Sequence, residues 1–241
     1  MTVITNIEDL RVLAHKRVPR MFYDYVDTGS WTEGTYRANE DDFQKIKFRQ
    51  RVAINMDNRT TRTQLVGQDV AMPVALAPVG STGMQWADGE ILAARAAGKF
   101  GVPFTLSTMS ICSIEDVAAN SPYPFWFQLY VMRDRAFIER LIERAKAAKC
   151  SALVLTLDLQ ILAQRHKDLK NGLSVPVKPT LASIANLLTK PSWCLAMAGT
   201  KRRQFGNIVG HVKGVDNMGS LSEWTSRQFD PTLNWADVEW I

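Results

Sequence analysis

Short apolar runs alternate with helical segments through the middle of this chain, and this order constrains its fold more than any other feature. The apolar runs cover 74–80, 102–108, 124–131 and 151–158, and the segments between them carry helical patterns. Strand and helix alternating at roughly 20–30 residues per unit predict a parallel sheet. Each run is continuously apolar, which indicates strands covered on both faces. We therefore expect an α/β fold, either an open doubly wound sheet or a TIM (β/α)8 barrel.

The segments between the runs begin and end at residues typical of helix termini. Ser113 and Asp134 are suited to cap the second and third helices, and Gly101 is suited to end the first. The third helix repeats apolar residues along one face. Before the sheet, we expect a helical segment that begins at Asn6 and is interrupted at Pro19.

Polar side chains gather where the apolar runs end. They are Ser107, Gln128, Tyr130, Thr156 and Asp158. In barrels and in open parallel sheets alike, ligands bind at the carboxyl ends of the strands. The first turn, APVGSTGM at 77–84, lacks the GxGxxG spacing of nucleotide-binding open sheets, which favours the barrel.

Each of these polar residues has a structural and a functional interpretation. Asp158 can pair with Arg165 or cap a helix, or it can orient a histidine base as the acid of a catalytic triad does. Arg165 can neutralise Asp158, or it can clamp a substrate carboxylate with its planar fork. Tyr25 and Tyr130 can be buried aromatics or donors to a carboxylate. Core strands rarely carry unpaired polar groups, so Ser107, Gln128 and Thr156 together indicate a polar ligand.

The chain changes character after Asp168. Residues 165–213 contain nine basic side chains and one acidic one, and 175–232 is expected to be a long connection. Such a basic field suits a polyanionic surface, either lipid headgroups or nucleic acid. Trp193, Leu195 and Met197 next to the basic cluster 201–203 indicate either a packed loop or a membrane-surface segment. The short TKRR stretch matches no nucleic-acid-binding motif, so we expect no nucleic-acid partner.

Composition excludes several other classes. The N-terminus has no signal-peptide pattern and no window is apolar enough to span a membrane, so a cytoplasmic location is expected. Three scattered cysteines indicate reduced thiols. None of the three histidines, His15, His166 and His211, has the neighbours of a metal ligand, so no metal site is expected.

Seven blocks of this sequence, in the same order, resemble the FMN-dependent α-hydroxy-acid dehydrogenases and oxidases. The blocks are FYDYVDTGSWTEGTYRAN, FRQRV, MPVALAPVGSTGM, FTLSTMSICSIEDVA, FWFQLYV, LTLDLQILAQRHKDLKNGL and FDPTLNWADVEW. The family is a TIM barrel with FMN at its mouth. The resemblance implies that this chain holds an N-terminal segment (1–72), strands one to four (73–174) and a long basic loop (175–232).

The resemblance also implies roles for individual residues. The backbone of Pro78, Val79 and Gly80 would face the flavin, and Ser107, Gln128 and Thr156 would hydrogen-bond it. Tyr25, Tyr130 and Arg165 would bind the substrate. Asp158 would pair with the catalytic histidine, and Tyr130 would join it in catalysis. The family's histidine lies beyond the fourth strand, at a position that none of the three histidines here matches.

The implied activity is oxidation of an L-2-hydroxy acid, with L-lactate the leading candidate, by a chain that is incomplete and inactive alone. Gly80 and the basic loop resemble the dehydrogenases, which implies a quinone or other respiratory acceptor and peripheral contact with the inner face of the plasma membrane through 175–214. A homo-oligomer is expected for the complete protein. The alternatives are an oxidase that uses oxygen and a non-catalytic truncated half-barrel.

Overall fold

The N-terminal third of the chain is a set of helices followed by a long extended arm. The structure is a computed structural model that describes residues 3–158, 163–173, 180–215, 218–228 and 230–241. Its first elements are α1 (Ile7–Arg17), α2 (Arg20–Val26), α3 (Gly34–Asp41) and the 3-10 helix η1 (Asp42–Lys45). Asn6 caps α1 through a reciprocal capping box, and Pro19 separates α1 from α2, both as predicted.

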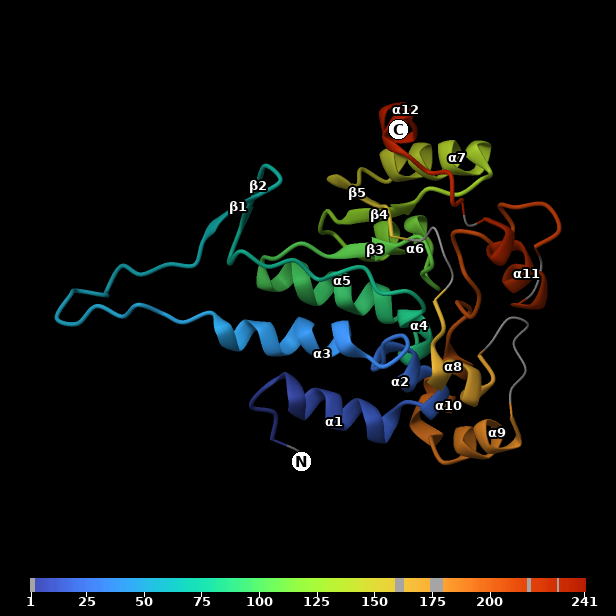
Figure 1. Cartoon of the computed structure of the whole chain (residues 1–241), viewed down its shortest axis with the longest axis horizontal. Coiled ribbons are helices and arrows are strands. Elements are labelled where there is room, and N and C mark those ends of the chain that lie inside the picture. Colours follow the sequence, from blue (N-terminus) through green and yellow to red (C-terminus); the bar gives the residue numbers. More distant parts are fainter. Residues whose placement is uncertain (1–2, 159–162, 174–179, 216–217, 229) are drawn as a thin grey trace.

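The arm, residues 46–62, extends away from the rest of the molecule (Figure 1). All of its residues are exposed, including Phe48 at 92%. It leads into an antiparallel hairpin of β1 (Thr63–Leu65) and β2 (Gln68–Val70), which the sequence analysis missed. Val66 and Gly67 both adopt positive φ, as a two-residue hairpin turn demands, but valine is rare in that conformation and gave no turn signal.

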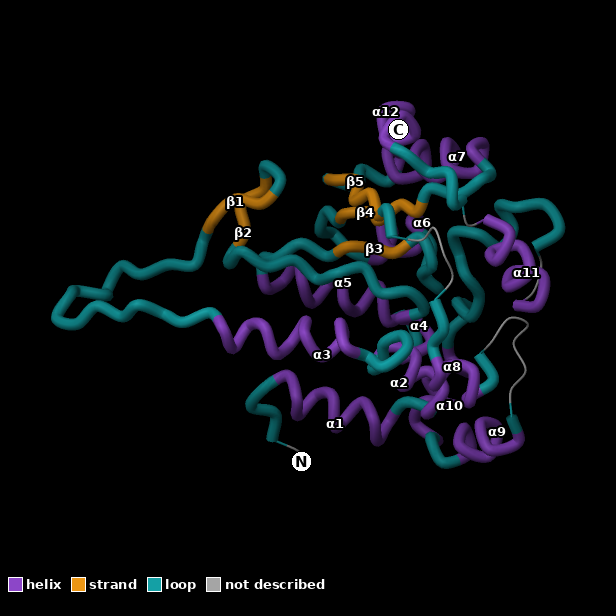
Figure 2. Tube along the Cα trace, in the orientation of Figure 1, coloured by secondary structure: helices purple, strands orange, loops and turns teal. Residues whose placement is uncertain are grey.

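The central sheet has three parallel strands in the order β3 (Thr105–Ser107), β4 (Trp126–Tyr130) and β5 (Ala152–Thr156). The helices that connect or precede these strands are α4 (Thr82–Gln85), α5 (Gly89–Phe100), α6 (Ile114–Asn120) and α7 (Arg135–Ala147). Figure 2 shows the strands grouped among these helices. Ser113 and Asp134 cap α6 and α7, and Gly101 ends α5 with a left-handed φ, all as predicted.

Two expectations about the strands need correction. The run 74–80 was predicted as a strand, but it forms a single parallel bridge between Leu76 and Phe104. The run 151–158 was predicted to be buried on both faces, but β5 is only half-buried and Asp158 beyond it is exposed. Both runs lie at the edges of the small sheet, where only one side has a neighbouring strand. β3 and β4, in contrast, are buried as predicted.

The sheet is therefore open, and the described chain forms part of an α/β wall whose barrel is not closed. Its core lies between the sheet and α5, α6 and α7, where Phe127, Leu129, Phe137, Ile138 and Leu141 have no exposed surface. Burying side chains of this size stabilises a domain by about 1.5–3 kcal/mol each. This packed wall holds the strand ends rigidly in place.

The region after β5 was expected to be a long connection, but much of it is helical. Its elements are α8 (His166–Asn171), α9 (Leu181–Leu188), α10 (Pro191–Gly199), α11 (Met218–Gln228) and α12 (Trp235–Trp240). Pro191 occupies the first turn of α10, and Asn234 caps α12 with a capping box. The helix at the C-terminal end of the sequence was predicted, whereas α9 and α10 were not. The apolar residues of α10 lack a helical period, and α9 is a short helix of eight residues.

Candidate active site

Three of the predicted cofactor-binding side chains form one hydrogen-bonded row across the sheet. The Ser107 hydroxyl donates to Oε1 of Gln128 at 3.2 Å, and Nε2 of Gln128 donates to the Thr156 hydroxyl at 2.8 Å. The strand register allows this arrangement, because Ser107 lies opposite Gln128, and Thr156 lies two residues beyond Val154, the register partner of Gln128 on β5. Gln128 uses one of its two amide hydrogens in the row, and its side chain is fully buried.

Thr108 reinforces the row from the end of β3. Its hydroxyl donates to the carbonyl of Gln128 at 2.6 Å and accepts from the backbone N–H of Tyr130 at 3.3 Å. Thr108 is fully buried. It therefore fixes the backbone of β4 where the strand delivers Gln128 and Tyr130 to the carboxyl end of the sheet. Thr108 was not predicted as a site residue, because a threonine at a strand end gives no distinctive signal.

Tyr25 of α2 lies next to the turn at residues 78–81, at the same end of the sheet. A Cβ atom placed on Gly80 would lie 3.0 Å from the Tyr25 hydroxyl, so a larger residue would push this phenol away. The backbone N–H of Ser81 donates to the carbonyl of Met109 at 2.8 Å, which ties the turn to the end of β3. Pro78 and Gly80 are half-buried and Val79 is exposed, so the turn presents its backbone at the surface of the site.

Tyr130 and Asp158 lie close enough to interact electrostatically. Burial, the Asp158 carboxylate and the neighbouring Tyr25 raise the pKa of Tyr130 to about 12. Burial also raises the pKa of Tyr25, against the opposing influence of Arg165. Both phenols consequently remain protonated at neutral pH. Each phenol can therefore donate a hydrogen bond to a ligand carboxylate.

Arg165 contacts residues of α2 and the turn that follows it, and it does not contact Asp158. Its guanidinium donates to the backbone carbonyls of Tyr25 and Thr28 and lies 4.9 Å from the centre of the Tyr25 ring. Nε of Arg165 forms an ion pair with Asp168 at 2.8 Å. The pairing of Arg165 with Asp158, which was one of the interpretations of these two residues, is therefore wrong. Asp168 lies one helical turn further along the chain, where α8 can hold both groups together.

The three histidines lie at different places in the fold. His15 packs edge-on against Tyr23, and His166 packs edge-on against Trp31. His211 accepts a hydrogen bond at its backbone carbonyl from Arg140. Burial and Arg144 lower the pKa of His211.

Two buried side chains that were not predicted as site residues bond the backbone around the ends of the strands. Asn207, in the segment before α11, donates to the carbonyls of Ser107 and Thr108 and accepts from the backbone N–H of Ile114. Glu90 of α5 accepts from the backbone N–H groups of Gly83 and Ile111, each at 2.9 Å. Neither residue has a local sequence signal: Glu90 looks like an ordinary acidic residue in the first turn of a helix, and nothing near Asn207 distinguishes it.

The sequence matches a family of known flavoproteins. The family model for FMN-dependent dehydrogenases matches residues 14–241. The chain belongs to this family. It is 41% identical over 240 residues to an L-lactate dehydrogenase of Pseudomonas syringae pv. syringae, and 42% identical over 241 residues to one of Xanthomonas campestris pv. campestris. These matches cover 99% of this chain but only 63% and 62% of the two relatives.

The fold matches solved structures to the same extent. A crystal structure of the monotopic membrane protein (S)-mandelate dehydrogenase gives a TM-score of 0.91 at 31% identity, and a mandelate oxidase gives 0.75 at 28%. The dehydrogenase match covers 99% of this chain and 63% of that one, and the oxidase match covers 98% and 59%. The prediction of a TIM barrel is thus confirmed in part, since the neighbours are TIM barrels and this chain forms less than two thirds of one.

The cofactor of the family is FMN, as the sequence predicted, and the residues present suit its ring system. A flavin ring presents alternating hydrogen-bond donors and acceptors along one edge. The amide of Gln128 and the hydroxyls of Ser107 and Thr156 offer both kinds of partner in a largely apolar surrounding. At Gly80 the absence of a side chain lets the backbone lie close to the Tyr25 hydroxyl and to Met109.

Proposed function

We propose that this chain carries the FMN-binding and substrate-binding part of an L-2-hydroxy-acid dehydrogenase, with L-lactate as the substrate. The observation that carries this proposal is the convergence of Tyr25, Tyr130 and Asp158 beside the Gly80 turn, at the carboxyl ends of parallel strands. The relatives that carry the name L-lactate dehydrogenase favour lactate over mandelate, because they are more similar in sequence than the mandelate enzymes.

Each residue has one proposed role. Ser107, Gln128 and Thr156 hold the edge of the flavin ring, and the backbone of 78–80 lies against its face. Tyr25 and Tyr130 donate to the substrate carboxylate, and the free side of the Arg165 guanidinium balances its charge. Asp158 orients a histidine base and stabilises the imidazolium that forms when that base removes a proton. Bound FMN supplies the two-electron acceptor.

In this proposal, α2 and α8 hold Arg165 in the position from which it binds the substrate. Its bonds to the Tyr25 and Thr28 carbonyls fix the guanidinium plane, and the ion pair with Asp168 fixes its rotation. A substrate carboxylate bound there meets a fork that is already oriented, so little conformational entropy is lost on binding. Tyr25 lies between this fork and Gly80, which supports a substrate position next to the flavin face.

We further propose that the histidine base and the groups that bind the FMN phosphate lie outside these 241 residues. The chain spans less than two thirds of the length of the relatives that it matches, and none of its histidines contacts Tyr130 or Asp158 among the described residues. The 241-residue chain is then inactive by itself.

The expected result is that the 241-residue chain purifies with little or no FMN, while the product of the full coding sequence retains it. The physical reason is that half a barrel supplies only one side of the flavin site. Absorbance at the flavin maximum, compared with protein content, measures the retained FMN in each preparation. Turnover of L-lactate by the 241-residue chain alone would contradict the proposal, as would a coding sequence that stops after Ile241 and yields an active enzyme.

The proposed electron acceptor is a quinone or another respiratory carrier, and the proposed location is the inner face of the plasma membrane. The α9–α10 region supports peripheral contact because it exposes Leu181, Leu188 and Leu195 at 86%, 80% and 75%. No helix within the described ranges is long and apolar enough to cross a bilayer. Faster reoxidation of the reduced flavin by oxygen than by a soluble quinone would instead indicate an oxidase.

We expect the complete protein to form a homo-oligomer, which light scattering of the full product can test. A monomer at all protein concentrations would contradict this expectation. The remaining alternative, a non-catalytic half-barrel, gains support only if the complete product neither binds FMN nor oxidises a 2-hydroxy acid.

A further inference from the structure

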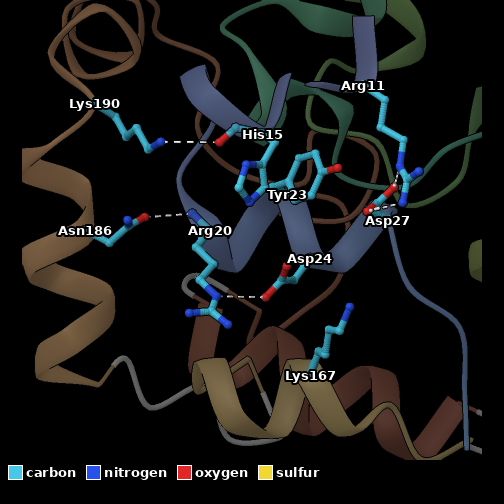
Figure 3. A pocket seen from close by; sticks show the side chains of 9 residues that line it. All are labelled: Arg11, His15, Arg20, Tyr23, Asp24, Asp27, Lys167, Asn186 and Lys190. Carbon is cyan, nitrogen blue, oxygen red and sulfur yellow. Dashed lines mark hydrogen bonds and ion pairs between the residues drawn. The ribbon is translucent and has the colours of Figure 1, made fainter. Parts of the chain in front are cut away.

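A cation-rich cavity lies on the opposite side of α2 from the candidate active site. It has a volume of about 530 Å³ and is bordered by α1, α2, α8 and the α9–α10 region. We call it the α9 cavity and define it by Arg20, Asp24, Lys167, Asn186 and Lys190 (Figure 3). A second cavity of about 280 Å³ shares Arg20 and Asn186 with it. Neither cavity contains a residue that the proposed reaction uses.

The carboxylates in the α9 cavity already have hydrogen-bond partners. Asp27 accepts two hydrogen bonds from the Arg11 guanidinium, at 2.6 and 3.1 Å. Asp24 accepts from Nδ2 of Asn171 at 2.8 Å and pairs weakly with Arg20 at 3.4 Å. These contacts leave the positive charges of Lys167 and Lys190, and part of that of Arg20, without a matching carboxylate.

The remaining donors are directed at the cavity. Lys167 extends from α8 toward it and has no hydrogen bond or ion pair within the described part of the chain (Figure 3). Lys190 donates to the backbone carbonyls of His15 and Lys16, at 3.3 and 2.7 Å, and keeps one ammonium hydrogen. Asn186 accepts from the backbone N–H of Arg20 through its oxygen, so its amide N–H₂ is free to donate. A phosphate group needs this combination of charge and donors.

The helix that closes the cavity has an apolar outer face. Leu181, Ile184 and Leu188 are exposed and share one side of α9, whereas Asn186 and the buried Ser183 lie on the opposite side. A helix is about 10 Å across. If the leucines enter the acyl region of a bilayer, the cavity behind α9 lies at the depth of the lipid phosphates, because interfacial helices sink about 5–10 Å into that boundary.

We propose that the α9 cavity binds the phosphate of an anionic lipid headgroup. This inference rests on the proposed membrane contact and adds a specific site to it. The apolar face of α9 supplies attachment to any bilayer, and the cavity supplies preference for anionic phospholipid. Lipid is favoured over free phosphate because the same helix presents both the leucines and a wall of the cavity.

Vesicle sedimentation of the full-length protein tests the proposal. The vesicles are phosphatidylcholine alone, or phosphatidylcholine with phosphatidylglycerol at two to one. The cavity variant is Lys167→Gln with Arg20→Gln. The matched control is Lys201→Gln with Lys213→Gln, which removes the same charge from exposed residues of the basic segment that do not line the cavity.

The cavity variant should bind anionic vesicles about 10-fold more weakly than the unmodified protein, and the control should lose at most about twofold. Binding to neutral vesicles should be the same for all three proteins. Equal losses for the cavity variant and the control would overturn the headgroup site. Stabilisation by inorganic phosphate that the cavity variant lacks, combined with equal vesicle binding, would assign the cavity to free phosphate and overturn its lipid source.

Failure of the underlying membrane proposal gives a different result. The variant Leu181→Ser with Leu188→Ser should lose binding to both kinds of vesicle, since it removes the apolar contact. If the unmodified protein binds neither kind of vesicle, the membrane contact itself is refuted, and the headgroup site with it. If the leucine variant binds as well as the unmodified protein while the cavity variant still loses anionic preference, only the apolar contact is refuted.

Discussion

Replacing Asn207 with alanine is expected to lower the free energy of unfolding by about 3–4 kcal/mol. Asn207 is fully buried and contacts both the C-terminal end of β3 and the N-terminal end of α6. It accepts from the Ile114 backbone at 2.9 Å and donates to Ser110 at 3.0 Å and to the carbonyls of Ser107 and Thr108. Alanine leaves these buried groups without partners and opens a small cavity.

Urea denaturation of the purified chain measures this effect as a shift of the midpoint at an unchanged slope. The matched control is Asn120→Ala, because Asn120 makes a single side-chain bond to the carbonyl of Asp116 within α6. The control should lower the free energy of unfolding by no more than about 1 kcal/mol. Equal effects of the two substitutions would show that Asn207 does not join the segment before α11 to the strand ends.

Replacing Arg165 with methionine is expected to lower kcat/KM for the 2-hydroxy acid by about 10²–10⁴-fold in the complete enzyme. Methionine removes the positive charge proposed to bind the substrate carboxylate. It also releases the carbonyls of Tyr25 and Thr28, which lets α2 shift the Tyr25 phenol. Asp168 loses its ion pair, so its pKa, which burial already raises, should rise further.

Steady-state kinetics of the complete enzyme check this prediction. The Arg165→Lys variant keeps the charge but cannot hold the carbonyls and Asp168 together, so it should recover only part of the loss. Arg203→Met serves as the matched control, because Arg203 is exposed and bonds only the carbonyl of Ala198. A KM and kcat that are unchanged in Arg165→Met would remove Arg165 from the substrate site.

Local signals predicted the elements that depend on nearby residues. Ser113 and Asp134 cap helices because their side chains reach backbone N–H groups three residues ahead. The buried strands β3 and β4 follow from continuous apolar runs. The row of Ser107, Gln128 and Thr156 was selected for its unusual polarity, and the parallel register then brought these side chains together.

The parts that the sequence could not predict depend on distant contacts. Asn207 reaches groups that lie about 100 residues earlier in the chain, and no local pattern records such a contact. Arg165 pairs with Asp168 and not with Asp158, because α8 places Asp168 one helical turn after Arg165. The helical pattern over residues 166–171 was too short to predict this helix. The exposure of β5 follows from its position at the edge of the sheet, which a strand's own composition does not reveal.

Anaerobic mixing of the complete, FMN-loaded protein with L-lactate tests the central claim most directly. We expect the flavin absorbance to bleach within the turnover time, with no bleaching by D-lactate and slower bleaching by L-mandelate. This order follows if Tyr25, Tyr130 and Arg165 fix the substrate carboxylate and only one face of its carbon meets the flavin. A protein that binds FMN stoichiometrically but is reduced by no 2-hydroxy acid would contradict the account.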